Sequence, residues 1–302
     1  MLLRRLPLAG LRPVIGTLWA TDRQEPPSAG TRWERILPSG RMHLAFRLAG
    51  APIRILRAGR LGSVGWTVVS GARTEPYDKE LRDPGPVVGV DLEPGMSEWL
   101  LGIPASELAG CHTPLDEIWG RLVADELRSR LAACPTLEDR LTLVEAVLQA
   151  RLASRPCRPG TLDLVAAVRH LSSGGRVADA VRLSGLSHRH FLQRFQRAVG
   201  LPPKKFARVV RFQRALHALR DPSRGLAELA GASGYSDQAH LTRDFVEFAG
   251  LTPSAYLRVA PTSANHLPWP RPTARRAGSD LFKTGGSPTP ETPAPRWTGG
   301  GS

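Results

Sequence analysis

The chain has 302 residues, a formal net charge of +14 and a hydrophobic fraction of 41%, which together indicate about two folded domains and a polyanionic partner. Nothing in it resembles a secretion signal or approaches the run of about 18 uncharged apolar residues that spans a membrane, so the sequence favours a cytoplasmic protein without a membrane partner. Three isolated cysteines, Cys111, Cys134 and Cys157, form no Cys-x-x-Cys pair and indicate reduced thiols.

The first part of the chain, residues 1–95, has the pattern of short β-strands. Residues 41–48 alternate between apolar and polar side chains, as expected of a half-buried strand, and a Pro-Ser-Gly turn precedes them. Further short apolar runs, separated by Gly and Pro, are residues 53–56, 63–69 and 87–92. Several short strands at this spacing predict a small barrel or sandwich.

The hydrophobic period becomes helical after residue 96. Apolar side chains recur at helical spacing over residues 97–101, 115–131 and 136–152. The segment Arg-Pro-Cys-Arg-Pro-Gly at 155–160 is a linker, since its prolines and glycine interrupt a helix. Residues 1–154 are therefore predicted to form one domain and residues 161–260 another.

The second domain contains the same helix-turn-helix pattern twice. The first copy occupies residues 177–206 and the second residues 226–256; each has a short Ala-rich helix, Gly-x-Ser and a longer helix that ends at Gly-Leu-x-Pro. A long helix over residues 203–219 joins them. One such unit places one helix in one major groove, so two units on one chain can address two neighbouring groove segments.

Positive charge is concentrated on the first copy and the helix after it. Residues 169–220 hold twelve Lys or Arg against one acid, a net of +11, whereas residues 221–260 hold three Arg against five acids, a net of −2. A compositional bias alone would spread the charge more evenly. We therefore expect the first copy to supply most of the electrostatic attraction to DNA, and the second either to contribute sequence readout or to engage DNA loosely.

The outward face of each longer helix carries side chains that suit base recognition, because Arg pairs with guanine, Gln with adenine, and apolar groups meet the thymine methyl. In the first helix, over residues 188–199, Phe191 and Phe195 are expected to face the core. The competing interpretation is an ordinary solvated charged face. The predicted base contacts are Arg189, Leu192, Gln193, Gln196, Gln238, Ala239, Thr242 and Arg243. The predicted DNA backbone contacts are Ser187, His190, Arg197, Lys204, Lys205, Arg211 and His240.

Two stretches resemble the AraC/XylS-type DNA-binding domain, GLSHRHFLQRFQRAVGLPPKKFARVVRFQRAL at 185–216 and GYSDQAHLTRDFVEFAGLTPSAY at 234–256. The resemblance implies seven helices with two helix-turn-helix motifs, whose recognition helices enter successive major grooves on one face of DNA. Arg194 departs from the pattern, because it stands where this family often has an apolar residue.

The N-terminal part resembles, less closely, a sensor-like region that precedes this domain in some bacterial regulators; the matching stretches are residues 35–48 and 87–120. Because the family often binds a small effector or dimerises through its N-terminal domain, the resemblance implies an effector pocket. Side chains that could line it are Trp19, Trp33, His43, Trp66 and Trp99. Each of these alone is more often a core side chain.

Residues 261–302 are rich in Pro, Gly, Ser and Thr and are predicted to be a disordered tail. The chain contains no hydrolase elbow, zinc-protease motif or phosphate-binding loop, and a DNA-repair methyl-acceptor would need a cysteine cluster. We therefore expect no enzyme activity, no cofactor and no metal site.

The sequence thus predicts an α+β fold, in which a β-rich N-terminal sensor-like domain with trailing helices precedes an all-α double helix-turn-helix domain. The predicted function is sequence-specific regulation of bacterial transcription. Double-stranded promoter DNA is the expected partner, RNA polymerase and a small effector are candidate partners, and the protein would be a monomer or a homodimer. The alternative is an architectural or protein-interaction DNA-binding protein without effector control.

Overall fold

Two antiparallel sheets form the N-terminal half of the structure, a computed structural model that describes residues 1–22, 32–57, 59–82, 85–156, 164–221, 224–261 and 263–270. The first sheet has the strand order β1-β2-β9-β4-β7-β10 and the second the order β11-β3-β8-β5-β6. The strands are β1 (Leu2–Arg5), β2 (Ile15–Thr21), β3 (Trp33–Ile36), β4 (His43–Arg47), β5 (Arg54–Arg57), β6 (Arg60–Ser63), β7 (Thr67–Ser70), β8 (Tyr77–Glu80), β9 (Val87–Leu92), β10 (His112–Pro114) and β11 (His266–Trp269).

The centre of the first sheet is β9, which pairs with β2 on one side and β4 on the other. Its run of Val residues is almost wholly buried, as expected of a strand covered on both faces. Gly89 lies opposite Trp19 in this sheet, and a Cβ at position 89 would come within 2.0 Å of the indole ring. Glycine is therefore needed there so that the tryptophan can lie flat across the neighbouring strand.

The strands predicted from the sequence are present with one difference. The run predicted over 63–69 divides, because Gly65 adopts a left-handed backbone (φ +82) between β6 and β7. The other predicted runs correspond to β4, β5 and β9. The strands and helices together confirm the predicted α+β class.

Five helices follow or interrupt the sheets, preceded by a short 3-10 turn, η1 (Ala9–Leu11). They are α1 (Ser97–Leu101), α2 (Ala105–Leu108), α3 (Leu115–Trp119), α4 (Arg121–Ala133) and α5 (Leu137–Ala153). The single helix predicted over 115–131 is two helices, because Gly120 has φ +86 and ψ 146 and breaks the chain direction between α3 and α4. Thr136 caps α5 by accepting a hydrogen bond from the Asp139 amide at 3.0 Å.

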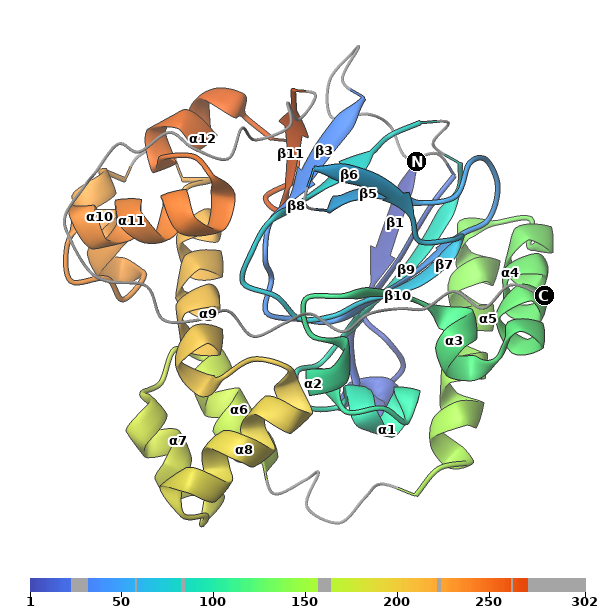
Figure 1. Ribbon diagram of the computed structural model, residues 1–302, viewed down its shortest axis with the longest axis horizontal. Coiled ribbons are helices and arrows are strands. Elements are labelled where there is room, and N and C mark those ends of the chain that lie inside the picture. The colour runs from blue at the N-terminus through green and yellow to red at the C-terminus, as the bar shows by residue number, and fades with distance from the viewer. Residues whose placement is uncertain are drawn as a thin grey trace. The chain divides into compact units, whose positions relative to one another are not determined.

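Seven helices are described between residues 164 and 261, as the family resemblance implies. They are α6 (Val165–Ser172), α7 (Val177–Ser184), α8 (His188–Val199), α9 (Pro203–Ala218), α10 (Leu226–Ala232), α11 (Gln238–Ala249) and α12 (Pro253–Val259). Figure 1 shows α9 running from the first helix-turn-helix unit (α7 and α8) to the second (α10 and α11). None of the helices in the described ranges is long and apolar enough to cross a membrane.

The two helix-turn-helix units belong to different hydrophobic cores. Phe191 and Phe195 of the first unit and Phe206 of α9 lie in the same cluster as the sheet residues and as Leu100 and Ala105 of α1 and α2. The second unit has a cluster of its own, built around Phe212, Leu229, Phe245, Phe248 and Tyr256. The first core therefore runs past the predicted domain boundary at 155–160, of which residues 157–160 lie outside the described residues.

The chain returns to the N-terminal half after the second unit. Strand β11 pairs antiparallel with β3, with Trp269 opposite Trp33, and Figure 1 shows the two strands side by side. Leu267 is fully buried in the second core, and Arg35 of β3 lies 3.5 Å from the ring of Trp269. The predicted disorder from residue 261 therefore does not extend over β11, whereas residues 271–302 lie outside the described residues.

Candidate nucleic-acid interface

The first recognition helix is α8, and its start and end are fixed by local chemistry. Gly185 ends α7 in the left-handed conformation (φ 64), and the Ser187 hydroxyl accepts a hydrogen bond from the His190 amide at 3.4 Å. Phe191 and Phe195 are fully buried, with ring centroids 5.5 Å apart. These contacts hold one side of α8 on the core and leave the other side to solvent.

The outward side of α8 carries the side chains predicted to contact bases. All four are exposed, and Leu192 is 37% exposed although it is apolar. They are Arg189, Leu192, Gln193 and Gln196. The predicted base-reading face is thus accessible, with Arg194 half-buried at its edge.

The basic groups predicted to contact the DNA backbone around α8 differ in their surroundings. His190, Lys204 and Lys205 are exposed, and the two lysines lie at the N-terminal turn of α9. Arg197 instead donates to a carboxylate oxygen of Glu98 in α1 at 2.9 Å. This ion pair connects the first recognition helix to the N-terminal half.

The second recognition helix is α11, and Asp237 is its N-cap. The Asp237 carboxylate accepts a hydrogen bond from the His240 amide at 2.7 Å, and this bond lowers the pKa of Asp237, with a further contribution from the Ser236 hydroxyl. Phe245 and Phe248 face inward and both contact Phe212 of α9. As in α8, the opposite side is left to solvent.

The predicted base contacts of α11 are also accessible. Gln238, Ala239 and Arg243 are exposed, whereas Thr242 is half-buried and its hydroxyl donates to the Gln238 carbonyl at 2.9 Å. The two recognition helices therefore present comparable faces, each beginning in the first turn of the helix.

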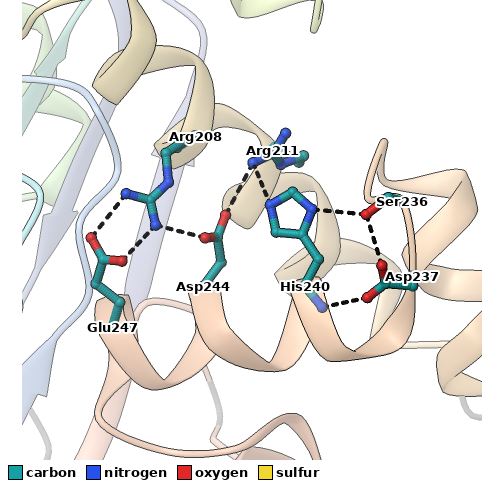
Figure 2. Close-up of polar contacts among 7 residues, drawn as sticks. All are labelled: Arg208, Arg211, Ser236, Asp237, His240, Asp244 and Glu247. Atoms are coloured by element: carbon teal, nitrogen blue, oxygen red, sulfur yellow. Dashed lines mark hydrogen bonds and ion pairs between the residues drawn. The ribbon is translucent and has the colours of Figure 1, made fainter. Parts of the chain in front are cut away.

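A network of charges joins α11 to α9 (Figure 2). Arg208 donates two hydrogen bonds to Glu247, at 3.0 and 2.5 Å, and a third to Asp244 at 2.7 Å. Arg211 donates to the other oxygen of Asp244 at 3.3 Å. Asp244 is 2% exposed, so its charge is balanced inside the protein by two guanidinium groups. The hydrogen bonds to Glu247 raise the pKa of Arg208, and the hydrogen bond to Asp244 raises it further.

The same network continues to the N-terminus of α11 through a chain of donors. Arg211 lies 3.2 Å from Nε2 of His240, and because a guanidinium only donates, Nε2 accepts and the ring proton is on Nδ1. Nδ1 then donates to the Ser236 hydroxyl at 3.2 Å, which in turn donates to Asp237 at 2.9 Å. Figure 2 shows this chain from Arg211 to the N-cap.

Arg211 and His240, both predicted to contact the DNA backbone, are therefore engaged within the protein. The net charge of the second unit does not reveal this pairing, because a net charge ignores where the acids lie. A stronger signal was present, since Asp244 and Glu247 are three residues apart on one side of α11, and Arg208 and Arg211 are three apart on α9.

The five side chains predicted to line an effector pocket do not all line the same cavity. Trp19 and His43 line a cavity of about 670 Å³, with His217, Arg220 and Asn265 from the C-terminal half. Trp33 is buried, Trp66 is 41% exposed, and the Trp99 indole donates to the Arg155 carbonyl at 2.9 Å. Within the described ranges, no group of three or more His, Cys, Asp or Glu side chains could hold a metal ion.

Two family models match the chain. Residues 180–259 match a model described as a helix-turn-helix domain, and residues 3–114 match a model described as a domain of unknown function, DUF6597. The first covers both recognition helices, and the second covers most of the two sheets.

Curated relatives match over part of their length. The MmsAB operon regulatory protein of Pseudomonas aeruginosa is 30% identical over 139 residues, which are 45% of this chain and 40% of the relative. The Msm operon regulatory protein of Streptococcus mutans is 26% identical over 148 residues, which are 48% of this chain and 50% of the relative. The chain thus spans half or less of the length of these relatives.

Among solved structures, ToxT from Vibrio cholerae matches with a TM-score of 0.44 and 10% sequence identity, over 82% of this chain and 99% of that one.

Proposed function

The C-terminal part of the chain is a helix-turn-helix domain of the AraC type, and from this premise we propose that the protein is a sequence-specific DNA-binding regulator of transcription. In this proposal α8 and α11 enter successive major grooves on one face of promoter DNA. The observation that carries it is that both helices expose a face of side chains suited to base recognition and are joined by the single helix α9.

The proposed readout follows from the chemistry of the exposed side chains. Arg189 and Arg243 suit guanine, because a guanidinium can donate to both major-groove acceptors of that base. Gln193, Gln196 and Gln238 suit adenine. The Thr242 hydroxyl can bond to a donor or an acceptor of a base. Leu192 and Ala239 suit the thymine methyl. The half-sites would lie about one helical turn of DNA apart.

Electrostatic affinity would come mainly from the first unit. Lys204 and Lys205 are exposed at the start of α9, and phosphates can also approach Ser187 and His190 at the N-terminus of α8. Arg197, Arg211 and His240 remain proposed backbone contacts; the two arginines would have to exchange their present carboxylate partners for phosphate.

The N-terminal half would supply the regulatory input. The cavity of about 670 Å³ has a volume typical of small-molecule sites, and its lining comes from the sheets, from the end of α9 and from the segment before β11. A small effector bound there would contact both halves of the chain at once. Dimerisation through the N-terminal half is the other proposed route, and RNA polymerase is the proposed partner at the promoter.

The function is tested by selecting genomic fragments with the purified chain at about physiological salt, with random DNA as competitor. The proposal predicts enrichment of one motif that spans two adjacent major-groove segments. Binding without any enriched motif, with or without added cell extract, would favour an architectural DNA-binding protein and contradict the proposal.

A further inference from the structure

A second cavity, of about 540 Å³, lies beside the larger one. Its lining includes Arg57 from the end of β5, Arg73 and Tyr77 from the β7–β8 segment, and His112 at the start of β10. Leu201, which follows the C-cap of α8, completes it. The volume is within the range that binds small molecules in proteins.

Arg73 is a half-buried cation that forms no ion pair with a carboxylate of the described residues. Its guanidinium donates to the carbonyls of Gly71 at 3.3 Å and Cys111 at 2.8 Å, and to the Ser70 hydroxyl at 3.3 Å. Burial lowers the pKa of Arg73 and the charge of Arg57 lowers it further, whereas Tyr77, Cys111 and Glu75 act in the opposite direction. Among the described residues it forms no ion pair, and its Nη1 makes no hydrogen bond.

Arg57 brings a second positive charge to the same cavity. It donates to the His112 carbonyl at 3.2 Å, and within the described part of the chain it too has no ion-pair partner. Glu75 also lines the cavity and its charge acts on Arg73, but it is exposed and forms no contact ion pair with either arginine in the described ranges. Two like charges at one cavity wall repel each other and favour a negative group between them.

His112 adds a hydrogen-bond donor for which the described part of the chain offers no acceptor. Arg73 donates to Nδ1 of His112 at 3.3 Å, so this nitrogen accepts and the proton of the neutral ring is on Nε2. Burial, followed by the charges of Arg73 and Arg57, lowers the pKa of His112 to about 2, so the ring is neutral at physiological pH. The side chain is 6% exposed and Nε2 has no partner among the described residues.

A buried N–H that finds no acceptor among the described residues is costly, and His112 lines both cavities. Arg57 and Arg73, which form no ion pair among the described residues, line the smaller cavity together with His112. Two guanidinium groups and a further N–H donor in one cavity suit a ligand group with negatively charged oxygen atoms.

We propose that the smaller cavity binds a small anionic ligand through a carboxylate or phosphate group, held by Arg73 and Arg57 with His112 as an additional donor. The remainder of the ligand would pack on Ile55 and Leu201. Leu201 directly follows Gly200, where a Cβ would come within 3.0 Å of the Ala105 carbonyl, so the ligand would contact the tightly packed junction at the end of the first recognition helix. The site does not depend on the proposed DNA binding.

The test is calorimetric titration of the DNA-free full chain with sodium phosphate, sodium benzoate and, as the neutral control, benzamide. We expect saturable one-to-one binding of phosphate or benzoate, and the anion that binds more tightly identifies the group. Benzamide should bind at least about tenfold more weakly, because it has no charge to pair with the arginines.

The variant Arg57→Gln should weaken binding of the anion about tenfold, since it removes one charge-assisted contact made by an exposed side chain. The matched control is Arg60→Gln, because Arg60 lies opposite Arg57 in the same hairpin, is exposed, and does not line the cavity. It should leave binding unchanged. Absence of binding by both anions, equal binding of benzamide, or equal losses in the two variants would overturn the proposal.

Discussion

The two recognition helices carry charges of opposite sign at corresponding positions, and these charges pair with different parts of the protein. Counted back from the terminal glycines Gly200 and Gly250, Arg194 corresponds to Asp244 and Arg197 to Glu247. In the first unit the basic residue Arg197 pairs with Glu98 of the N-terminal half, whereas in the second the two acids pair with Arg208 and Arg211 of α9. The same local motif is thus anchored to the N-terminal half in one copy and to the connecting helix in the other.

Because of this difference, the position of each unit depends on a different part of the protein. The first shares its core with the sheets, so its position follows that of α1 and α2. The second has its own aromatic core and its own ion network, and the sheets reach it through Leu37 and through the returning strand β11. A change in the N-terminal half would therefore reach the first recognition helix by direct packing and the second by way of α9 and β11.

The largest expected effect tests the anchoring of the second unit by β11. Leu267→Ala removes a fully buried side chain from the second core and should lower the free energy of unfolding by about 3 kcal/mol. The control Leu257→Ala changes a residue of α12 that is 45% exposed and should cost less than about 0.5 kcal/mol. Urea unfolding measures both, and equal losses would show that β11 does not stabilise the second unit.

The ion network between α9 and α11 should come next in size. Asp244→Ala leaves two arginines facing a site without a carboxylate and should cost about 2 kcal/mol, less than for a fully buried pair because the side chains of Arg208 and Arg211 are 30% and 26% exposed. Glu247→Ala, at a side chain that is 54% exposed, should cost less than about 1 kcal/mol. If guanidinium unfolding gave the reverse order, Asp244 would not be the centre of the network.

Base contacts and phosphate contacts are expected to differ in how their loss changes DNA binding. Arg189→Ala and Arg243→Ala should each weaken binding to the selected site by about 1–3 kcal/mol and relax specificity at one position, because each removes a bidentate contact. Lys204→Ala should weaken binding to all sequences alike and reduce the salt dependence by about one counterion. Fluorescence anisotropy with cognate and random duplexes distinguishes these outcomes; equal losses on both duplexes for Arg189→Ala would reject it as a base contact.

The smallest effect concerns the link between the first recognition helix and α1. The Arg197–Glu98 pair has an arginine side chain that is 53% exposed, so Glu98→Gln should change the free energy of unfolding by less than about 1 kcal/mol. If Arg197 is also a phosphate contact, freeing it should leave affinity for DNA unchanged or slightly raised. A marked loss of affinity in an anisotropy titration would mean that the ion pair is needed to position α8.

The helix-turn-helix repeat could be predicted from sequence because its signals are local. Caps such as Ser187, glycines such as Gly185 and the spacing of Phe191 and Phe195 all act within a few residues. By contrast β11 has four residues, one of them proline, and it gains its structure from β3, more than 200 residues earlier in the chain. A composition rich in Pro and Ser predicts disorder as long as the strand with which the segment pairs is not known.

In the candidate site too, local features could be predicted from the sequence and contacts between distant segments could not. The outward faces of α8 and α11 followed from helical period, and the exposed positions are those expected, with Thr242 half-buried. The pairing of Arg208 and Arg211 with Asp244 depends on how two helices cross, which the period of either helix alone does not fix. The break at Gly120 was equally hidden, because the hydrophobic pattern continues across it.

The most direct test of the central claim is hydroxyl-radical footprinting and base-substitution mapping on the selected site with the wild-type chain, Arg189→Ala and Arg243→Ala. The account predicts protection of two segments about one helical turn apart on one face of the duplex, with each variant losing specificity in a different segment. Protection of a single segment, or loss of specificity at the same bases in both variants, would contradict the claim that the two differently anchored helices both read DNA.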